Sequence, residues 1–252
     1  MNLKLTYLVQ LLVAFHTSPS LGFQHVLPRN INHHPTRVLG GVTVIDTRLI
    51  RAAQAFARQS SADYLYNHIM RTWLFGALII NHNLTLAHTI DLEIHALGSL
   101  LHDLGLVLNA TWISPDRRFE VDSAFAATGF VELHTHNSSP GWDAHRLQLL
   151  FDSILLSSEP KFALYKEPTV AAVVDGVLID LQGAGDAITE EEYEGVVGAF
   201  PKGDFLSGVN RTLVELCVAK PNSTYDSWQQ AFGDAFVPGY SAAGSRIFDF
   251  FA

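Results

Sequence analysis

The sequence contains a single cysteine, Cys217, among its 252 residues. One cysteine excludes an intrachain disulfide and any cysteine-rich zinc or iron–sulfur site, so His, Asp and Glu are the metal ligands that remain. Basic residues are also few, because 16 Lys and Arg stand against 25 Asp and Glu and give a formal net charge of -9. A field of that sign repels nucleic acid, which we therefore exclude as a partner.

Charged residues of either sign make up only 16% of the chain, whereas hydrophobic residues make up 48%. This balance excludes a disordered or highly charged solvating protein and requires a packed core. The length suits one domain of about 200 residues once a leader is removed. Histidine is frequent, with 12 copies that are candidates for chemistry.

The first 22 residues have the pattern of a secretory signal peptide. One lysine precedes an apolar run from Leu5 to Phe15, and small and turn-forming residues lead to a cleavage point near Gly22. The run is too short to cross a bilayer core of about 30 Å, which argues against a membrane anchor, and a buried helix is the other alternative. We expect a protein that is secreted or held in the secretory-pathway lumen, with no membrane association after the signal is removed.

Asn-x-Ser/Thr sequons support this compartment, since asparagines in this motif accept N-linked glycans in the secretory pathway. The sequons lie at Asn83, Asn109, Asn137, Asn210 and Asn222. We expect a glycoprotein that carries at least one of these glycans.

Apolar residues recur every three or four positions through most of the chain after residue 45, which is the spacing of amphipathic helices. This pattern predicts an all-α fold, a compact helical bundle without a succession of strands. Residues 23–45 are expected to form an extended N-terminal arm, and residues 46–252 the helical domain with a C-terminal helical extension. The expected helices begin at a cap on Asp46 and then cover residues 62–81, 89–103, 123–134, 145–158, 168–178, 190–200 and 210–219.

Three residues on two neighbouring predicted helices have the character of metal ligands. His102 and Asp103 end the 89–103 helix, and His68 lies on the preceding helix. Imidazole and carboxylate together suit zinc, iron or manganese, and packed helices can bring such groups to one point. Asp180 is the candidate fourth ligand, because a carboxylate at the end of an apolar helix is costly to bury unless a metal or hydrogen bonds compensate it.

The same residues belong to an ordered series of blocks that resembles a known family. The blocks are residues 67–76 (NHIMRTWLFG), 100–105 (LLHDLG), 118–124 (RFEVDSA) and 149–154 (LLFDSI). They resemble the HD-domain metal-dependent hydrolase superfamily, and more narrowly its cyanamide-hydratase-like branch, over about residues 51–185. The resemblance implies an all-helical HD-domain fold and one divalent metal, zinc or iron, on His68, His102, Asp103 and Asp180. It also implies a hydratase that adds water to a nitrile-like carbon–nitrogen bond of a small-molecule substrate.

Three residues are candidates for the chemistry itself. Asp103 can receive a proton from metal-activated water. Arg71, one helical turn after His68, can orient a ligand carboxylate or bind substrate, and an ordinary surface ion pair is its alternative. Glu120 lies in a family-like block and is a candidate for catalysis, weighed against a structural role.

One position departs from the family pattern. The branch has a histidine shortly after the 149–154 block, where this chain has Ser157. An unassisted hydroxyl does not replace an imidazole as a base near neutral pH, so the departure weakens the hydratase interpretation and leaves the metal ligands intact. His134, His136 or His145 can take the missing role, although surface or structural roles are favoured for all three.

Two other functions stay open. Phosphoester hydrolysis is the chemistry of the wider superfamily, but Arg71 is nearly alone as a cation near the proposed ligands. A non-catalytic HD-like binding protein would keep the fold without the reaction, as Ser157 suggests. A histidine stripe at His88, His95 and His102 is not favoured as a metal site, because a lone helical histidine is more often a core or surface residue.

Overall fold

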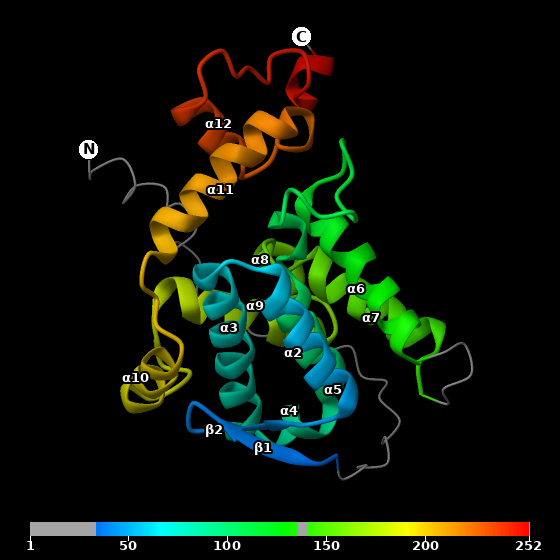
Figure 1. Cartoon of the computed structure of the whole chain (residues 1–252), viewed down its shortest axis with the longest axis vertical. Coiled ribbons are helices and arrows are strands. Elements are labelled where there is room, and N and C mark those ends of the chain that lie inside the picture. Colours follow the sequence, from blue (N-terminus) through cyan, green and yellow to red (C-terminus); the bar gives the residue numbers. More distant parts are fainter. Residues whose placement is uncertain (1–33, 136–140, 252) are drawn as a thin grey trace.

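A computed structural model describes residues 34–135 and 141–251. It confirms the all-α prediction, since these residues form a compact, mostly helical bundle with one small hairpin (Figure 1). The elements are β1 (Thr36–Leu39), β2 (Val42–Ile45), α2 (Arg48–Ser60), α3 (Asp63–His82), α4 (Leu84–Thr89), α5 (Leu92–Leu101), η1 (Leu104–Leu106), α6 (Phe119–Thr135), α7 (Ala144–Leu155), α8 (Pro160–Ala163), α9 (Pro168–Gln182), α10 (Glu190–Ala199), α11 (Phe205–Ala219), η2 (Pro221–Ser223), α12 (Gln230–Phe236) and η3 (Ile247–Phe250). The expected signal peptide, Asn137 and His136 lie outside the described residues.

Part of the expected N-terminal arm is an antiparallel hairpin. Strands β1 and β2 pair through a turn at Gly40 and Gly41, whose φ angles of 53° and 82° favour glycine. Val42 and Val44 are buried, and β2 packs on α3 and α5. Residues 36–39 and 42–45 of the expected arm are thus paired strands, and strands of four residues give too little alternation to stand out beside the neighbouring turn-forming residues.

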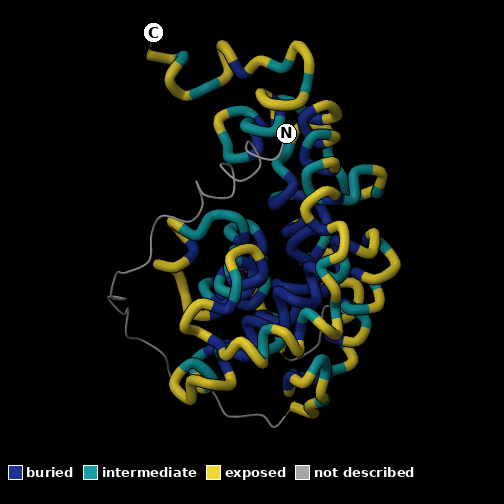
Figure 2. Tube along the Cα trace, turned by 90° about the vertical axis from the view of Figure 1, so that its left-hand side faces the viewer, coloured by how far each residue is buried: buried dark blue, intermediate teal, exposed yellow. Residues whose placement is uncertain are grey.

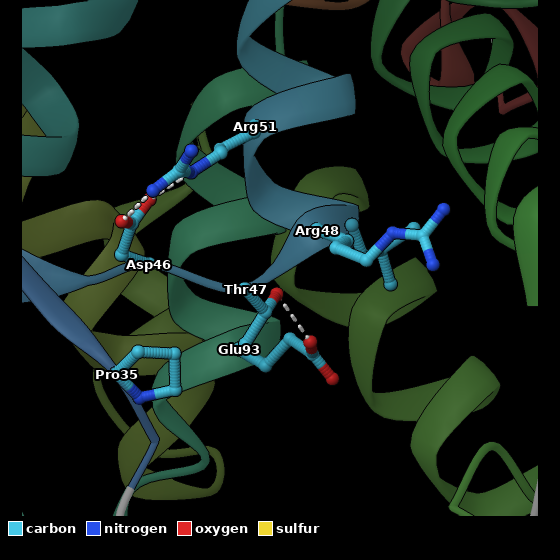
Figure 3. A pocket seen from close by; sticks show the side chains of 7 residues that line it. Pro35, Asp46, Thr47, Arg48, Arg51 and Glu93 are labelled. Carbon is cyan, nitrogen blue, oxygen red and sulfur yellow. Dashed lines mark hydrogen bonds and ion pairs between the residues drawn. The ribbon is translucent and has the colours of Figure 1, made fainter.

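Helix α2 begins one residue later than the Asp46 cap predicts. Thr47 is the cap, and its Oγ1 accepts a hydrogen bond from Ile50 N at 3.3 Å while donating one to Glu93 at 2.8 Å. Asp46 pairs instead with Arg51 beside a surface hollow of about 510 Å³ (Figure 3). This joins the hairpin, α2 and α5 at one corner of the bundle.

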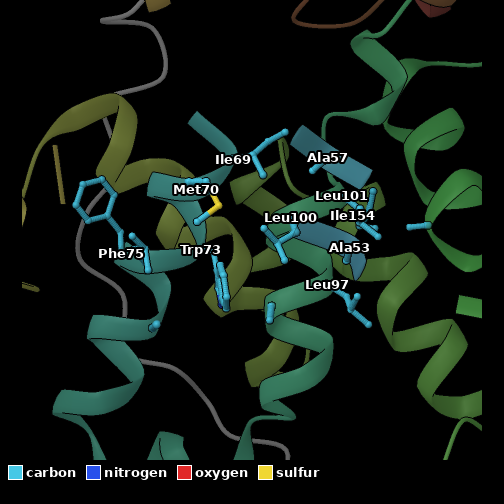
Figure 4. Packing of buried hydrophobic residues seen from close by; sticks show 14 of the residues in the cluster. Ala53, Ala57, Ile69, Met70, Trp73, Phe75, Leu97, Leu100, Leu101 and Ile154 are labelled. Atoms are coloured by element: carbon cyan, nitrogen blue, oxygen red, sulfur yellow. The ribbon is translucent and has the colours of Figure 1, made fainter. Parts of the chain in front are cut away.

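The centre of the bundle is α3, which is buried along most of its length and packs against α9, α5 and α11. Trp73 of α3, Leu97 and Leu100 of α5 and Ala53 of α2 belong to this core (Figure 4). Burying each large apolar side chain is worth about 1.5–3 kcal/mol, so this packing is the main force that holds α3 and α5 together.

The expected 89–103 helix is divided in two. The helical conformation is interrupted at Ile90. The side chain of Asp91 then caps α5 by accepting a hydrogen bond from Ile94 N at 3.2 Å. Asp91 also binds Arg146 of α7 at 2.9 and 3.0 Å, which fixes the start of α5 against the start of α7. His88 therefore lies on α4, and a common helical stripe of His88, His95 and His102 does not form.

The C-terminal helices are less deeply buried than the bundle. Figure 1 shows α11 and α12 projecting beyond it, and Figure 2 shows far fewer buried residues in that part of the chain. Helix α11 begins at Phe205, earlier than the expected residue 210, and Phe205 is itself buried. Among the described residues, none of the helices has the length and apolar character needed to cross a membrane.

Candidate metal centre

Three buried side chains converge at the end of α5. His68 projects from α3, while His102 and Asp103 directly follow α5. The Nε2 atoms of the two histidines are 3.3 Å apart, and Asp103 Oδ2 lies 3.5 Å from His68 Nε2 and 3.3 Å from His102 Nε2. The residues are 5%, 2% and 6% exposed, respectively. The structure thus brings together three of the four expected ligands.

The other ring nitrogen of each histidine determines what its Nε2 can do. His68 Nδ1 lies 2.6 Å from Asp180 Oδ2, and His102 Nδ1 lies 2.8 Å from the carbonyl oxygen of Ser99. Carboxylate and carbonyl oxygens only accept, so in the neutral rings both Nδ1 atoms carry the hydrogen and both Nε2 atoms present lone pairs. Burial lowers the pKa of His102, which favours its neutral form.

Two imidazole lone pairs and one carboxylate oxygen therefore face one another. Such a set of acceptors is repulsive unless a cation lies among them. A tetrahedral ion with bonds of about 2.0–2.1 Å separates neighbouring ligand atoms by about 3.3–3.4 Å. The observed separations of 3.3–3.5 Å match this value, so the cluster can hold one divalent metal ion.

Asp180 is not one of the converging ligands. Its Oδ2 accepts from His68, and Arg71 donates to both carboxylate oxygens, with Nε 2.6 Å from Oδ1 and Nη2 2.9 Å from Oδ2. Burial raises the pKa of Asp180, but the hydrogen bonds from His68 and Arg71 outweigh burial and lower it to about 2. Hydrogen bonds thus compensate the buried carboxylate and Asp180 orients His68 from behind, while its role as a fourth ligand stays a prediction.

Arg71 does not face the space between the ligands. It is 0% exposed, and besides Asp180 its Nη1 binds the carbonyl oxygens of Phe200 at 3.0 Å and Pro201 at 3.1 Å. Lys202 in the same loop donates to the backbone carbonyl of Asp180 at 2.7 Å. The expected catalytic role of Arg71 in binding substrate is therefore corrected to the positioning of Asp180.

Glu120 forms hydrogen bonds with neighbouring side chains, one of which belongs to the C-terminal segment after α11. Its Oε1 accepts from Arg118 at 2.7 Å, from Ser158 at 2.6 Å and from Gln229 at 2.8 Å, and the residue is 1% exposed. These bonds connect α6 to the residues that follow α11. The expected catalytic role is corrected to the structural alternative.

Ser157 follows α7, a helix that packs beside α5. Asp91 at the start of α5 binds Arg146 at the start of α7, and a Cβ on Gly98 would lie 3.3 Å from Ser153 Cβ, so the two helices run side by side in the same direction. Ser157 lies one turn after Ser153, just beyond the end of α7. Ser157 is 2% exposed, and its Oγ has no hydrogen-bond partner among the described residues.

The other candidate histidines do not join the centre. His88 is exposed on α4, and His145 is exposed at the start of α7, the end remote from Ser157. His134 stacks on Phe130 and bonds the carbonyl of that residue at the end of α6. Among the described residues, these three histidines lie apart from the converging side chains.

Two residues that the sequence alone did not indicate lie beside the centre. The ring of Phe205 stacks on that of His68, with centroids 4.8 Å apart. Tyr64 shares a 2.5 Å hydrogen bond with Thr212, and burial raises its pKa, with a further contribution from the charge of Asp103. The four-residue spacing of Tyr64 and His68 on one helix was an available signal, whereas no local pattern indicates Phe205.

No protein-family model matches the chain, and no curated protein matches it either. The HD-domain assignment therefore stays a prediction from the sequence blocks. The surface hollow of Figure 3 and a second one of about 680 Å³ beside α12 include none of the three converging residues.

Proposed function

We propose that the protein is a metal-dependent enzyme that uses water on a small molecule, and that its substrates are nitrile-like, of the cyanamide type. The observation that supports this best is the buried triangle of His68 Nε2, His102 Nε2 and Asp103 Oδ2. Structural zinc sites are usually closed by four protein ligands, whereas catalytic sites use three and keep a position for water or substrate. A converging set of three side chains without Asp180 therefore favours a catalytic site.

Each residue of the centre has a distinct task in this proposal. A bound zinc or iron ion supplies Lewis acidity and lowers the pKa of water. His68 and His102 hold the ion through Nε2, and their orientation is kept by Asp180 and by the Ser99 carbonyl. Asp103 provides Oδ2 as a ligand, and its carboxylate is the acceptor for the proton that the attacking water loses.

The surroundings of the centre favour a small, uncharged substrate. The three ligands are almost completely buried, and Phe205 covers the ring of His68. Phosphoesters fit less well, because Arg71 is fully engaged with Asp180 and backbone carbonyls. A linear nitrile needs neither a cationic pocket nor a wide opening.

A non-catalytic binding protein is the second candidate, and Ser157 is the observation that favours it. Ser157 stands where the resembled family has a histidine, and a serine hydroxyl does not titrate near neutral pH. A protein of this class would bind metal and small molecules without turnover.

Metal analysis followed by activity assays tests the proposal. The mature protein, supplied with zinc or iron, should contain about one ion per chain and convert cyanamide to urea only when metal is present. If Ser157 has cost a general acid or base, Ser157→His should raise the rate by about 10²–10⁴. Lack of stoichiometric metal in metal-replete protein overturns the proposal, and metal without turnover in both proteins favours the binding protein.

The secretory compartment is part of the same proposal. Asn83, Asn109 and Asn222 are exposed and accessible to glycosylation, whereas Asn210 lies within α11 with a buried Oδ1. We expect secreted protein to lose mass on deglycosylation and to begin near Phe23. An intact Met1 with no mass change would contradict secretion and leave the metal proposal unaffected.

A further inference from the structure

The helices that carry the metal centre keep one register along their length. His68 of α3 lies beside His102 of α5, and a Cβ on Gly76 would lie 2.3 Å from Nε2 of His95. The two helices therefore run antiparallel. Thr72 lies one turn from both His68 and Gly76, and Ser99 lies between His102 and His95, so the two hydroxyl residues occupy the same level.

Helix α9 forms a third wall in the same register. Asp180 binds His68 at the level of the metal centre, and a Cβ on Gly176 would lie 2.2 Å from the carbonyl oxygen of Thr72 one turn away. At the next turn, the carbonyl oxygen of Ala172 would be 3.0 Å from a Cβ on Gly76. Three closely packed helices thus keep one register from the candidate metal centre into the bundle, and we call the levels of Thr72 with Ser99 and of Gly76 with His95 the column.

The polar side chains of this column are buried and unpaired. Thr72 and Ser99 are 0% exposed and His95 is 2% exposed. Thr72 Oγ1, Ser99 Oγ and His95 Nε2 have no hydrogen-bond partner among the described residues. Burial of a polar group without a partner is unfavourable, and such groups in proteins are nearly always hydrogen-bonded.

Hydroxyls on the neighbouring helices α6 and α7 are satisfied by the backbone of their own helix. Ser153 donates to the carbonyl of Leu149 at 2.7 Å, and Thr128 donates to that of Ala124 at 3.0 Å. Thr72 and Ser99 make no such bond, although both lie within helices. Their hydroxyls are therefore available to a partner between α3 and α5.

We propose that Thr72, Ser99 and His95 form an internal water-binding column beneath the metal centre. Water suits the three groups because it can donate to one and accept from another, and internal water commonly serves buried polar groups that lack a protein partner. A charged ligand is unsuited, because burial lowers the pKa of His95 to about 4 and leaves its ring neutral at physiological pH.

The column would link the metal centre to the interior. The backbone carbonyl of Ser99 accepts from His102 Nδ1, so a water on the Ser99 hydroxyl is attached to the residue that orients one ligand. His95 lies at the far end, two turns from the centre. The inference depends on the side chains of α3 and α5 and not on the bound metal, so it can fail or succeed independently of the proposed enzyme.

A crystal structure of the full mature chain, at a resolution that shows ordered water, tests the column. We expect at least one water within about 2.7–3.2 Å of two of the three atoms, Thr72 Oγ1, Ser99 Oγ and His95 Nε2. The proposal is overturned if the hydroxyls bond to each other or to helical carbonyls and no water lies among them.

Two variants provide a second test. Thr72→Val keeps the shape of the side chain and removes the hydroxyl, so it should lose the water and lower the Tm by about 2–4 °C. In a dry column the same change removes an unpaired group, and an unchanged or raised Tm would overturn the proposal. Ser153→Ala is the control for losing a buried hydroxyl that bonds its own helix, and Ser99→Ala replaces Thr72→Val if the latter does not fold.

Discussion

Two of the places where the described residues bury acidic side chains differ in the partners that these side chains meet. On α6, Asp122 accepts from Lys220 at 2.7 Å and from Arg117 at 2.8 Å, while Glu120 accepts from Arg118 and Gln229. Every one of these partners is a donor, and two of them come from the C-terminal segment. Such a group needs no further ion, and its effect is to attach that segment to the bundle.

The second group is the metal centre, where Asp103 meets two ring nitrogens that are themselves acceptors. The two groups differ in whether the neighbours of the carboxylate are hydrogen-bond donors or acceptors. They do not differ in the degree of burial, which is similar at Asp103 and Glu120. A buried carboxylate among donors is explained by the fold, whereas one that faces two neutral ring nitrogens is stabilised when a cation binds among them. The comparison separates a structural acidic cluster from a candidate metal site.

The largest effect should come from removing a ligand. His102→Ala and Asp103→Ala should each abolish stoichiometric metal binding, because three side chains converge there among the described residues and cysteine is not available to replace one. Metal content of the purified variants, measured after metal loading, tests this. His88→Ala on α4 and Glu120→Gln on α6 are the controls and should keep the metal. Equal metal content in His102→Ala and the parent would contradict the proposal that these side chains bind a metal.

A change in the other group should affect stability and leave the metal in place. Lys220 is 4% exposed, and Lys220→Met leaves Asp122 buried with Arg117 as its remaining cation. We expect a loss of about 3 kcal/mol in the free energy of unfolding, measured by urea denaturation. Lys166→Met breaks a partly exposed pair with Asp152 at 3.0 Å and should cost less than about 1 kcal/mol. Similar losses in the two variants would contradict the structural role of the α6 group.

The sequence predicts most of the helices because apolar periodicity reports burial, which is what holds a bundle together. It did not predict the break at Ile90, since an Asp cap in the middle of an apolar pattern is a weak local signal. His68, His102 and Asp103 could be found because adjacent ligands at a helix end and a histidine on the preceding helix are local features. Their convergence is a consequence of how α3 and α5 pack.

The role of Asp180 could be predicted only in part. Burial of a carboxylate at the end of an apolar helix requires compensation, and that inference is confirmed by its 0% exposure and its bonds. Whether a metal or an arginine compensates Asp180 depends on which face of α3 packs against α9. The sequence of either helix alone does not determine how the two helices are aligned. For the same reason the hydrogen bond between Glu120 and Gln229 could not be predicted, because the two residues lie in distant parts of the chain.

Buried histidines offer a further contrast, because His95 has no charged partner while His68 has Asp180. Burial lowers the pKa of His95 to about 4 from a model-peptide value near 6.5. Between these values the unfolded chain binds a proton that the native protein excludes, so stability is greatest above about pH 6.5 and falls towards pH 4 by about 3 kcal/mol. The stability of His95→Gln should fall less over this range in urea denaturation. Parallel pH profiles for the two proteins would contradict the prediction.

The smallest effect should come from Asp180, which distinguishes a ligand from a residue that orients one. Asp180→Asn keeps the shape of the side chain but can place an amide donor against His68 Nδ1, which favours the ring tautomer with hydrogen on Nε2 and opposes metal binding. We expect metal affinity to fall by about 10–100-fold, measured by competition with a chelator, with stoichiometric binding kept at saturating metal. Lys202→Met removes a bond to the Asp180 backbone carbonyl and a 3.9 Å ion pair with Oδ1 but keeps the bonds from His68 and Arg71, so it is the matched control and should bind metal like the parent. A loss of metal binding as complete as that of His102→Ala would place Asp180 among the direct ligands. The distinction between Asp180 at Nδ1 of His68 and the metal at Nε2 would then be wrong.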